Sequence, residues 1–284
     1  MKLINGVEIP DFGFGTYKIP NNEIGVNAIK EAINDGYTLI DTAAGYGNEE
    51  AVAKAISLSN KKREDLFITT KLKNADQGYE STLKAFENSL EQLNTDYIDL
   101  YLVHWPITVE YRDEWKTRLA DSWKAIEELY NAKKIRAIGV CNFLPHHFEV
   151  LKETAKIMPM LNQIEFNPTY QQIEAVNYSK VHNILVEAWG TLIRGDLDNE
   201  LLVQVANRRH ASPACICLAF ARQSGIIPLS KSIHPRRIKE NLNFQDIELT
   251  EDDMNLLRSM NTTTNYTFHP DRNEEWGAKL PTIK

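Results

Sequence analysis

Short apolar runs alternate with stretches of helical period along this chain, and that alternation limits the possible folds more than any other feature. Between the runs, apolar residues recur at helical spacing, as Leu83, Phe86, Leu90 and Leu93 do. Strands alternating with helices predict a parallel sheet, and strands that are apolar nearly throughout suit a sheet buried on both faces. The eight expected strands span residues 12–16, 37–40, 66–70, 98–103, 135–140, 161–166, 184–188 and 226–229.

Eight strand–helix units in 284 residues favour an α/β fold, specifically a (β/α)8 TIM barrel. We expect it to span residues 1–284 as a single domain. An open, doubly wound sheet is the alternative, because periodicity does not reveal whether a sheet closes. Asn5-Gly6 lies between short apolar stretches and predicts an N-terminal β-hairpin with a type I′ turn. Residues 251–260 are expected to form an additional helix.

The composition excludes several classes of protein. With 43% hydrophobic and 25% charged residues the chain is expected to be globular, and its net charge of −7 argues against nucleic acid as a partner. Cys141, Cys215 and Cys217 are too few for a secreted disulfide framework. No signal peptide is visible, and the most apolar stretch, residues 213–221, has about half the length of a membrane span. We therefore expect a cytoplasmic protein with no membrane contact.

Four titratable side chains lie at or shortly after the ends of three successive apolar runs. Asp41 follows the second run with Tyr46 close behind it, Lys71 follows the third run, and His104 follows the fourth. Any one of them alone is expected to be a turn residue, a helix cap or a solvated charge. A barrel gathers the carboxyl ends of its strands at one face, where barrel active sites lie, so the four together predict a catalytic site.

The chemistry of these four groups is complementary. Lys71 beside Tyr46 would lower the pKa of the phenol, and Asp41 would hold Lys71 charged and in place. A tyrosine tuned in this way is a general acid for a carbonyl oxygen, with His104 orienting that oxygen or sharing the proton. Such a site donates a proton, so a hydride has to come from another source.

These residues belong to a series of motifs by which the chain resembles the aldo-keto reductase family. Within that family it is similar to the bacterial diketogluconate and glyoxal reductases. The motifs occur in the order of the family and cover nearly the whole chain. They are Asp41-Thr42-Ala43 with Tyr46, Asn48 and Glu49; Thr70-Lys71; Leu102-Val103-His104-Trp105-Pro106; Gly139-Val140-Cys141-Asn142-Phe143; Asn162-Gln163-Ile164-Glu165 with Asn167-Pro168; and Lys231-Ser232 with Arg237, Glu240 and Asn241.

The resemblance implies a (β/α)8 barrel with an N-terminal hairpin closing its bottom, and NADPH as a cofactor bound without a Rossmann fold. It implies reduction of aldehydes or ketones, including sugar-derived or dicarbonyl substrates, with Tyr46 as proton donor and Asp41, Lys71 and His104 completing the catalytic set. The implied cofactor residues are Gly15, Thr16, Asn142 and Gln163 (the last two at the nicotinamide carboxamide), Trp189 stacked on the ring, Gly190, Leu192, Lys231, Ser232, Arg237 and Asn241. The implied substrate residues are Tyr17 and Trp105.

The cationic group near the C-terminus can also be argued from its residues alone. Lys231, Ser232 and Arg237 combine two cations, a hydroxyl and the start of a helix, and these together make an anion site. The resemblance assigns that anion as the adenosine 2′-phosphate, with Asn241 at the adenine. A solvated basic stretch at a helix start is the alternative reading.

The chain departs from the family pattern at several places. Cys141 stands where the family usually has serine, so one carboxamide contact is expected to be weaker. Gly190-Thr191 replaces the usual Ser-Pro, which should leave that loop more flexible. The connection over residues 193–200 is too short to strap over a cofactor. The tail, with Tyr266, Phe268 and Trp276, is expected either to fold over the substrate mouth or to pack without touching substrate.

Two other functions are weighed against the enzyme. One is a regulatory or structural barrel that binds the cofactor without turnover; the complete catalytic set argues against it. The other is a metal-dependent hydrolase, but the seven histidines form neither HxH nor HExxH, so no metal is expected. We expect a small carbonyl compound as the partner, and a monomer.

Overall fold

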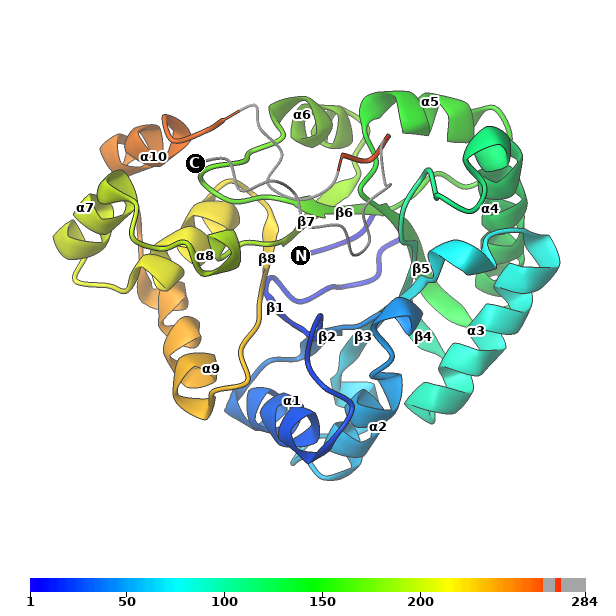
Figure 1. Ribbon diagram of the computed structural model, residues 1–284, viewed down its shortest axis with the longest axis horizontal. Coiled ribbons are helices and arrows are strands. Elements are labelled where there is room, and N and C mark those ends of the chain that lie inside the picture. The colour runs from blue at the N-terminus through cyan, green and yellow to red at the C-terminus, as the bar shows by residue number, and fades with distance from the viewer. Residues whose placement is uncertain (263–268, 272–284) are drawn as a thin grey trace.

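A computed structural model shows that the protein forms a closed barrel of eight parallel strands, in the order β1 to β8 (Figure 1). The structure describes residues 1–262 and 269–271. Because β1 pairs with β8 as well as with β2, the open sheet that periodicity left possible is excluded. The strands are β1 Gly13–Gly15, β2 Leu39–Asp41, β3 Phe67–Leu72, β4 Ile98–Val103, β5 Ile135–Cys141, β6 Leu161–Glu165, β7 Leu185–Trp189 and β8 Ile227–Ser230.

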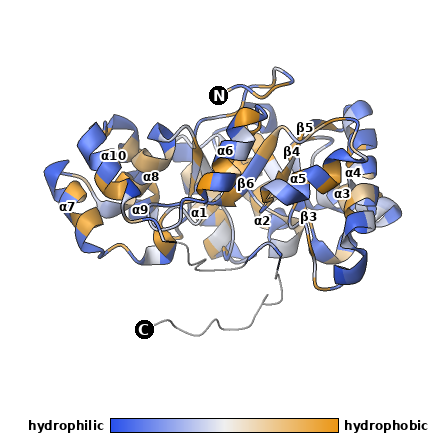
Figure 2. Cartoon of the chain, turned by 90° about the horizontal axis from the view of Figure 1, so that it is seen from above, coloured by the Kyte–Doolittle hydropathy of each residue, from blue (hydrophilic) through white to orange (hydrophobic). Residues whose placement is uncertain are grey.

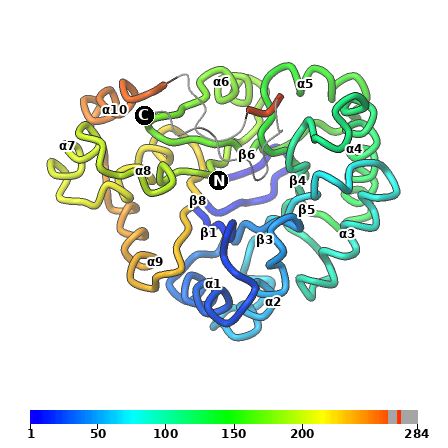
Figure 3. The backbone as a smooth tube through the Cα atoms, viewed as in Figure 1, coloured from blue at the N-terminus to red at the C-terminus, as the bar shows by residue number. Residues whose placement is uncertain are grey.

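Helices surround the barrel, and the chain passes repeatedly from the central strands to the periphery and back (Figure 3). None of the described helices is long and apolar enough to cross a membrane. The expected helix at residues 251–260 is present as α10. The helices within the described residues are α1 Glu23–Asp35, α2 Glu49–Ser57, α3 Tyr79–Leu93, α4 Trp115–Asn131, α5 Pro145–Lys152, α6 Ile173–Val181, α7 Glu200–Arg208, α8 Pro213–Gln223, α9 Pro235–Asn241 and α10 Glu251–Arg258.

Several helices are amphipathic and bury one face, whereas α8 is buried on all sides from Cys215 to Ala221. In α1 the buried residues include Val26, Ile29 and Ile33, at helical spacing. The side chain of Asn22 caps the N-terminus of α1, and Gly36 ends the helix at a φ of 116°, which favours glycine. Figure 2 shows the peripheral helices carrying both hydrophobic and hydrophilic residues, as expected of helices between a core and solvent.

The strands are buried along their whole length where the barrel is most regular. All residues of β3 and β4 are buried, and β4 has the nearly continuous apolar sequence that such a strand favours, whereas β3 carries two threonines and a lysine toward its carboxyl end. Two of the expected catalytic residues lie within strands rather than after them: Asp41 is the last residue of β2, and Lys71 is the fifth of the six residues of β3. Both side chains therefore start from rigid backbone.

The N-terminal segment makes a single antiparallel bridge, between Lys2 and Glu8, in place of two named strands. Asn5 donates to the carbonyl of Arg136 at 2.9 Å, so the segment lies at the amino-terminal end of β5. The type I′ turn was a wrong prediction. Gly6 has a φ of 88°, but Asn5 is not among the residues of positive φ; its side-chain oxygen instead accepts from the amide of Val7 at 3.1 Å.

Candidate active site

A cavity of about 730 Å³ lies at the carboxyl ends of the strands. Its size is in the range of cofactor and ligand sites, about 300–1,000 Å³. The expected site residues that line it are Gly15, Tyr17, Asp41, Tyr46, His104, Trp105, Asn142, Gln163, Trp189, Gly190, Leu192, Lys231, Ser232, Arg237 and Asn241. The structure thus brings together residues that are up to 226 positions apart, from Gly15 on the first strand to Asn241 at the end of α9.

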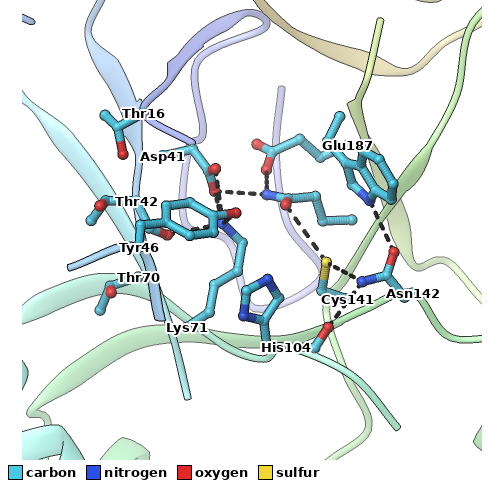
Figure 4. A network of polar contacts seen from close by, with 12 residues as sticks. Thr16, Asp41, Thr42, Tyr46, Thr70, Lys71, His104, Cys141, Asn142 and Glu187 are labelled. Carbon is cyan, nitrogen blue, oxygen red and sulfur yellow. Dashed lines mark hydrogen bonds and ion pairs between the residues drawn. The ribbon is translucent and has the colours of Figure 1, made fainter. Parts of the chain in front are cut away.

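Asp41, Lys71 and Tyr46 form a contiguous polar chain at the floor of this cavity (Figure 4). The ammonium of Lys71 donates to both carboxylate oxygens of Asp41, at 2.7 and 2.8 Å, and to the backbone carbonyl of Thr42 at 2.9 Å. Its Nζ lies 3.3 Å from the hydroxyl oxygen of Tyr46. Asp41 therefore fixes Lys71, and Lys71 reaches the phenol, as the sequence predicts.

The pKa of Tyr46 shifts in the direction opposite to the prediction. Burial raises the pKa of the phenol above its ordinary value, and the opposing effect of Lys71 does not overcome it. Burial alone would lower the pKa of Lys71, but Asp41 and Tyr46 more than offset that, and the net shift is upward. The protein without ligands therefore holds a protonated phenol beside a charged ammonium.

His104 lies directly after β4 and faces the phenol, with the ring centroids of Tyr46 and His104 5.6 Å apart. Burial, and secondarily the charge of Lys71, hold the pKa of His104 well below its ordinary value. The imidazole is thus neutral at neutral pH. A neutral imidazole can orient a carbonyl oxygen without competing with Tyr46 as the proton donor.

The two amides expected at the nicotinamide carboxamide are held by their neighbours. Asn142, with a φ of 64°, accepts from the indole of Trp189 at 2.9 Å and donates to the carbonyl of His104 at 3.0 Å. Gln163 donates to Asp41 at 2.7 Å and lies with its Oε1 3.6 Å from the sulfur of Cys141. Cys141 is buried, and burial raises the pKa of its thiol, which agrees with a structural strand residue.

The other end of the cavity is cationic. Lys231, Ser232 and Arg237 come from the end of β8 and the start of α9, and all three line the cavity. Burial and the nearby charge of Lys18 lower the pKa of Lys231. A bound anion would relieve this repulsion, so the donor set fits the phosphates of a dinucleotide.

Two expected residues do not line the cavity. Lys71 is fully buried behind Asp41 and Tyr46, which line the cavity, and Thr16 is buried, with its hydroxyl 3.4 Å from the side-chain oxygen of Asn48. The tail aromatics Tyr266, Phe268 and Trp276 lie outside the described residues. The connection after Trp189 is short, as expected: a 3-10 turn at Ile193–Gly195 is followed by α7 at Glu200.

The sequence did not predict several residues of this region, three of which are charged. Lys18 and Arg194 line the cavity. Lys18 directly follows Tyr17, and Arg194 lies two residues after Leu192, so a positive charge close to a predicted site residue could have indicated both. Arg194 lies over the ring of Trp189 and 3.6 Å from the carboxylate of Glu165. Glu187, a carboxylate inside an apolar run, is fully buried behind the cavity wall.

A second polar cluster joins the start of α5 to Asp271 near the C-terminus. The side chains of His146, His147 and Asp271 each offer one atom that could ligate a metal ion, and these three atoms lie within 4.8 Å of one another. The Nδ1 atom of His147 accepts from the amide of Leu144 at 3.0 Å, so its proton sits on Nε2, 2.8 Å from Asp271. That tautomer favours contact with the carboxylate over metal ligation.

A protonated phenol, a neutral imidazole and a cavity with a cationic end, all at the carboxyl face of a parallel barrel, define a barrel enzyme that moves a proton beside an anionic cofactor. A model of the Aldo/keto reductase family matches residues 11–262, and the chain belongs to that family. It is an oxidoreductase that reduces carbonyl compounds with a nicotinamide dinucleotide.

Individual relatives are similar to this protein along nearly the whole chain. The glyoxal reductase of Bacillus subtilis (strain 168) is 46% identical over 272 residues, covering 95% of this chain and 96% of that protein. The crystal structure of MGS-M4, an aldo-keto reductase from a Medee basin deep-sea metagenome library, matches with a TM-score of 0.90 at 40% identity, covering 96% and 98%. A variant of Gox0644, solved in complex with NADPH, matches with a TM-score of 0.89 at 32% identity, covering 99% and 98%.

Proposed function

We propose that the protein reduces small aldehydes and dicarbonyl compounds to alcohols, with NADPH preferred over NADH. The observation that carries this proposal is the single cavity wall that joins Tyr46 and His104 at one end to Lys231 and Arg237 at the other. The similarity to a glyoxal reductase supports a small dicarbonyl as the substrate class. The solved relative with NADPH supports the cofactor.

A reduced nicotinamide, when bound, supplies the hydride to the carbonyl carbon. Tyr46 donates its proton to the carbonyl oxygen, and the ammonium of Lys71, 3.3 Å away, stabilises the phenolate that remains. Asp41 keeps Lys71 charged and in place through two short hydrogen bonds. His104, neutral because it is buried, orients the same oxygen. Tyr46 and His104 are the catalytic residues, and Asp41 and Lys71 are positioning residues.

The residues toward the cofactor divide by their chemistry. Asn142 and Gln163 would hold the carboxamide, Trp189 the face of the ring, and Lys231 with Arg237 the 2′-phosphate. Gly15, Gly190, Leu192, Ser232 and Asn241 complete the wall, and Tyr17 and Trp105 border the substrate end. The single-domain organisation, the hairpin as a closure of the barrel bottom, the monomeric state and the cytoplasmic location stay predictions.

The test is oxidation of NADPH, and separately of NADH, with a panel of glyoxal, methylglyoxal, simple aldehydes, simple ketones and keto-sugars. We expect turnover with the dicarbonyls and aldehydes and a lower KM for NADPH than for NADH. NADPH binding without turnover on any member of the panel would contradict the enzymatic proposal. Equal KM values for the two cofactors would contradict the cofactor preference.

A further inference from the structure

Glu187 is a buried carboxyl group that the mechanism above does not use. It lies on β7 with none of its surface exposed, and its Oε1 accepts a hydrogen bond of 2.5 Å from the side-chain amide of Gln163. Its other oxygen, Oε2, has no hydrogen-bond partner among the described residues. Figure 4 shows Glu187 on the side of the network opposite Asp41 and Lys71.

The strand register explains why these side chains meet. Cys141 on β5, Gln163 on β6 and Glu187 on β7 are successive register partners. Partners in register point to the same face of a sheet, so the three side chains form a row inside the barrel. From the middle of this row the amide of Gln163 also reaches Asp41 of β2, across the barrel, at 2.7 Å.

The two carboxyl groups determine which way the amide of Gln163 points. An amide nitrogen carries two N–H donors, and here one donates to Asp41 and the other to Glu187. Turning the amide over would place its oxygen against the carboxylate of Asp41, which repels it, and would leave Oε1 of Glu187 without a donor. The Oε1 atom of Gln163 therefore stays on the far side of the amide, near the sulfur of Cys141.

The protonation state of Glu187 agrees with this arrangement. Groups that face it are Asp41 from β2, Lys71 from β3 and Cys141 from β5. Burial, and then the charge of Asp41, raise the pKa of Glu187 to about 8, with Gln163 and Lys71 opposing that shift. Glu187 thus carries a proton at neutral pH. That proton belongs on Oε2, because Oε1 already accepts from Gln163.

The remaining amide at this end of the cavity cannot take the same role. The oxygen of Asn142 accepts from Trp189, and its nitrogen donates to the carbonyl of His104. Gln163 and Cys141 both line the cavity. Of the two amides, Gln163 alone has an oxygen that accepts from no N–H or O–H donor within the described residues; Cys141, 3.6 Å away, is only a weak donor.

We propose that Glu187 is a positioning residue of the cofactor site. By holding the second N–H of Gln163, it presents the Gln163 oxygen as an acceptor for the carboxamide N–H of a nicotinamide. This inference rests on the proposed function, because it requires that a nicotinamide dinucleotide binds in the cavity.

The test compares the affinities of two ligands, NADPH and its reduced 3-acetylpyridine analogue, in which a methyl group replaces the carboxamide –NH2 and the carbonyl is kept. Kd is measured by quenching of tryptophan fluorescence, without any substrate. The wild-type protein should bind the analogue about tenfold more weakly, which is roughly what one hydrogen bond contributes. Glu187→Leu should bind NADPH about tenfold more weakly and should distinguish the two ligands by less than about twofold.

Two variants serve as controls. Glu187→Gln is nearly isosteric with the protonated acid and keeps an acceptor for Gln163, so it should keep the wild-type preference. Glu127→Leu removes another buried carboxylate, which accepts from the amides of Lys156 and Ile157 away from the cavity, and it should keep the preference as well. Circular dichroism checks folding, and Glu187→Val replaces Glu187→Leu if the latter does not fold.

The outcomes distinguish a failure of the proposed function from a failure of the role of Glu187. If the wild type binds neither ligand, the proposed function fails. If the wild type prefers NADPH and Glu187→Leu keeps that preference, the role of Glu187 is refuted while the proposed function stands. A wild type that binds both ligands equally would also overturn the inference, because Gln163 would then not accept from the carboxamide.

Discussion

At the scale of single residues, the chemistry of the site depends on where a few protons reside. Tyr46 and His104 are both neutral because they are buried, and Lys71 is charged because it is paired with Asp41. The sequence predicts the identity of these groups but gives the wrong direction for the pKa of Tyr46. The reason is that a strand-end motif reveals which charge is near, and burial, the larger effect here, depends on the whole packed barrel.

Tyr46→Phe removes only the hydroxyl and keeps the ring. We expect kcat to fall by about 10²–10⁴, the usual contribution of general acid catalysis, with NADPH affinity nearly unchanged. Lys71→Met should also lower kcat, and the effects of the two substitutions should be far from additive, because Lys71 acts through Tyr46. Steady-state kinetics and cofactor titration on the two single variants and the double variant check this. Near-normal kcat in Tyr46→Phe would disprove the assignment of the proton donor.

Arg237→Ala tests the cationic end of the cavity. Loss of a charge-assisted contact to the 2′-phosphate should cost about 1.5–3 kcal/mol, or roughly one to two decades in NADPH affinity. NADH lacks that phosphate, so its KM should change little. Arg236→Ala is a matched control, because Arg236 neighbours Arg237 but pairs with Glu240 on the surface and does not line the cavity. Equal losses for the two cofactors would argue against the phosphate contact.

The raised pKa of Glu187 predicts a pH dependence of stability. The native pKa of about 8 exceeds the ordinary value of 4.5, so the native state binds the proton more tightly than the unfolded state. The associated stability is fully present below pH 4.5 and is lost as the pH rises through about 8, by at most about 1.4 kcal/mol per pH unit. Glu187→Gln cannot ionise and should lack this slope. Urea unfolding of both proteins across this range measures it, and parallel curves would rule the prediction out.

At the scale of elements, the sequence predicts the number and order of the strands well and their ends less well. β4 coincides with its apolar run, but β2 begins two residues later than its run and extends to Asp41. Tyr37 precedes β2 and is nevertheless buried, with its hydroxyl in contact with Ser230 and with the carbonyl of Ile238. An apolar run reports burial, and burial does not stop where strand pairing stops.

The same limit explains the residues that were missed. Glu187 interrupts an apolar run, and its partner Gln163 is 24 positions away on the neighbouring strand. Only the register of β6 against β7 brings the two together, and one sequence does not reveal register between parallel strands. Asp41, Tyr46, Lys71 and His104 were found because strand ends in a barrel converge whatever the register.

The end of α4 offers a stability test of local backbone geometry. Lys133 follows this helix with a φ of 62° and is exposed, whereas the neighbouring Lys134 is exposed without a positive φ. Lys133→Gly should raise the free energy of unfolding by up to about 1 kcal/mol, and Lys134→Gly should lower it by a similar amount. Thermal or urea unfolding of the two variants checks this. A loss of stability in Lys133→Gly would count against the assigned conformation.

At the scale of the whole molecule, the cofactor cavity spans the place where the barrel closes. Gly15 belongs to β1, and Lys231 with Ser232 follows β8, which pairs with β1 at Gly13 and Phe14. A dinucleotide that contacts both sides binds only the closed barrel. NADPH at about 100 times its Kd should therefore add about 2.7 kcal/mol to the free energy of unfolding.

A thermal-shift titration measures this stabilisation. Adenosine 2′,5′-bisphosphate, which offers only the adenosine end of the cofactor, is the comparison ligand and should give a smaller shift at equal concentration. Arg237→Ala should reduce the shift with both ligands. A melting temperature that does not change with saturating NADPH would contradict binding to the closed barrel.

Closure of the ring also sets when the protein can become active during its own synthesis. A ribosome releases β8 long after β1 to β7, and until β8 inserts, β1 and β7 are open sheet edges of the kind that pair with other chains. The lysine and arginine of the cationic end emerge with or after that last strand. A nascent chain cut short before β8 would therefore lack both a sealed barrel and the cationic end of its cofactor site, so we expect premature termination to yield an aggregation-prone, inactive fragment.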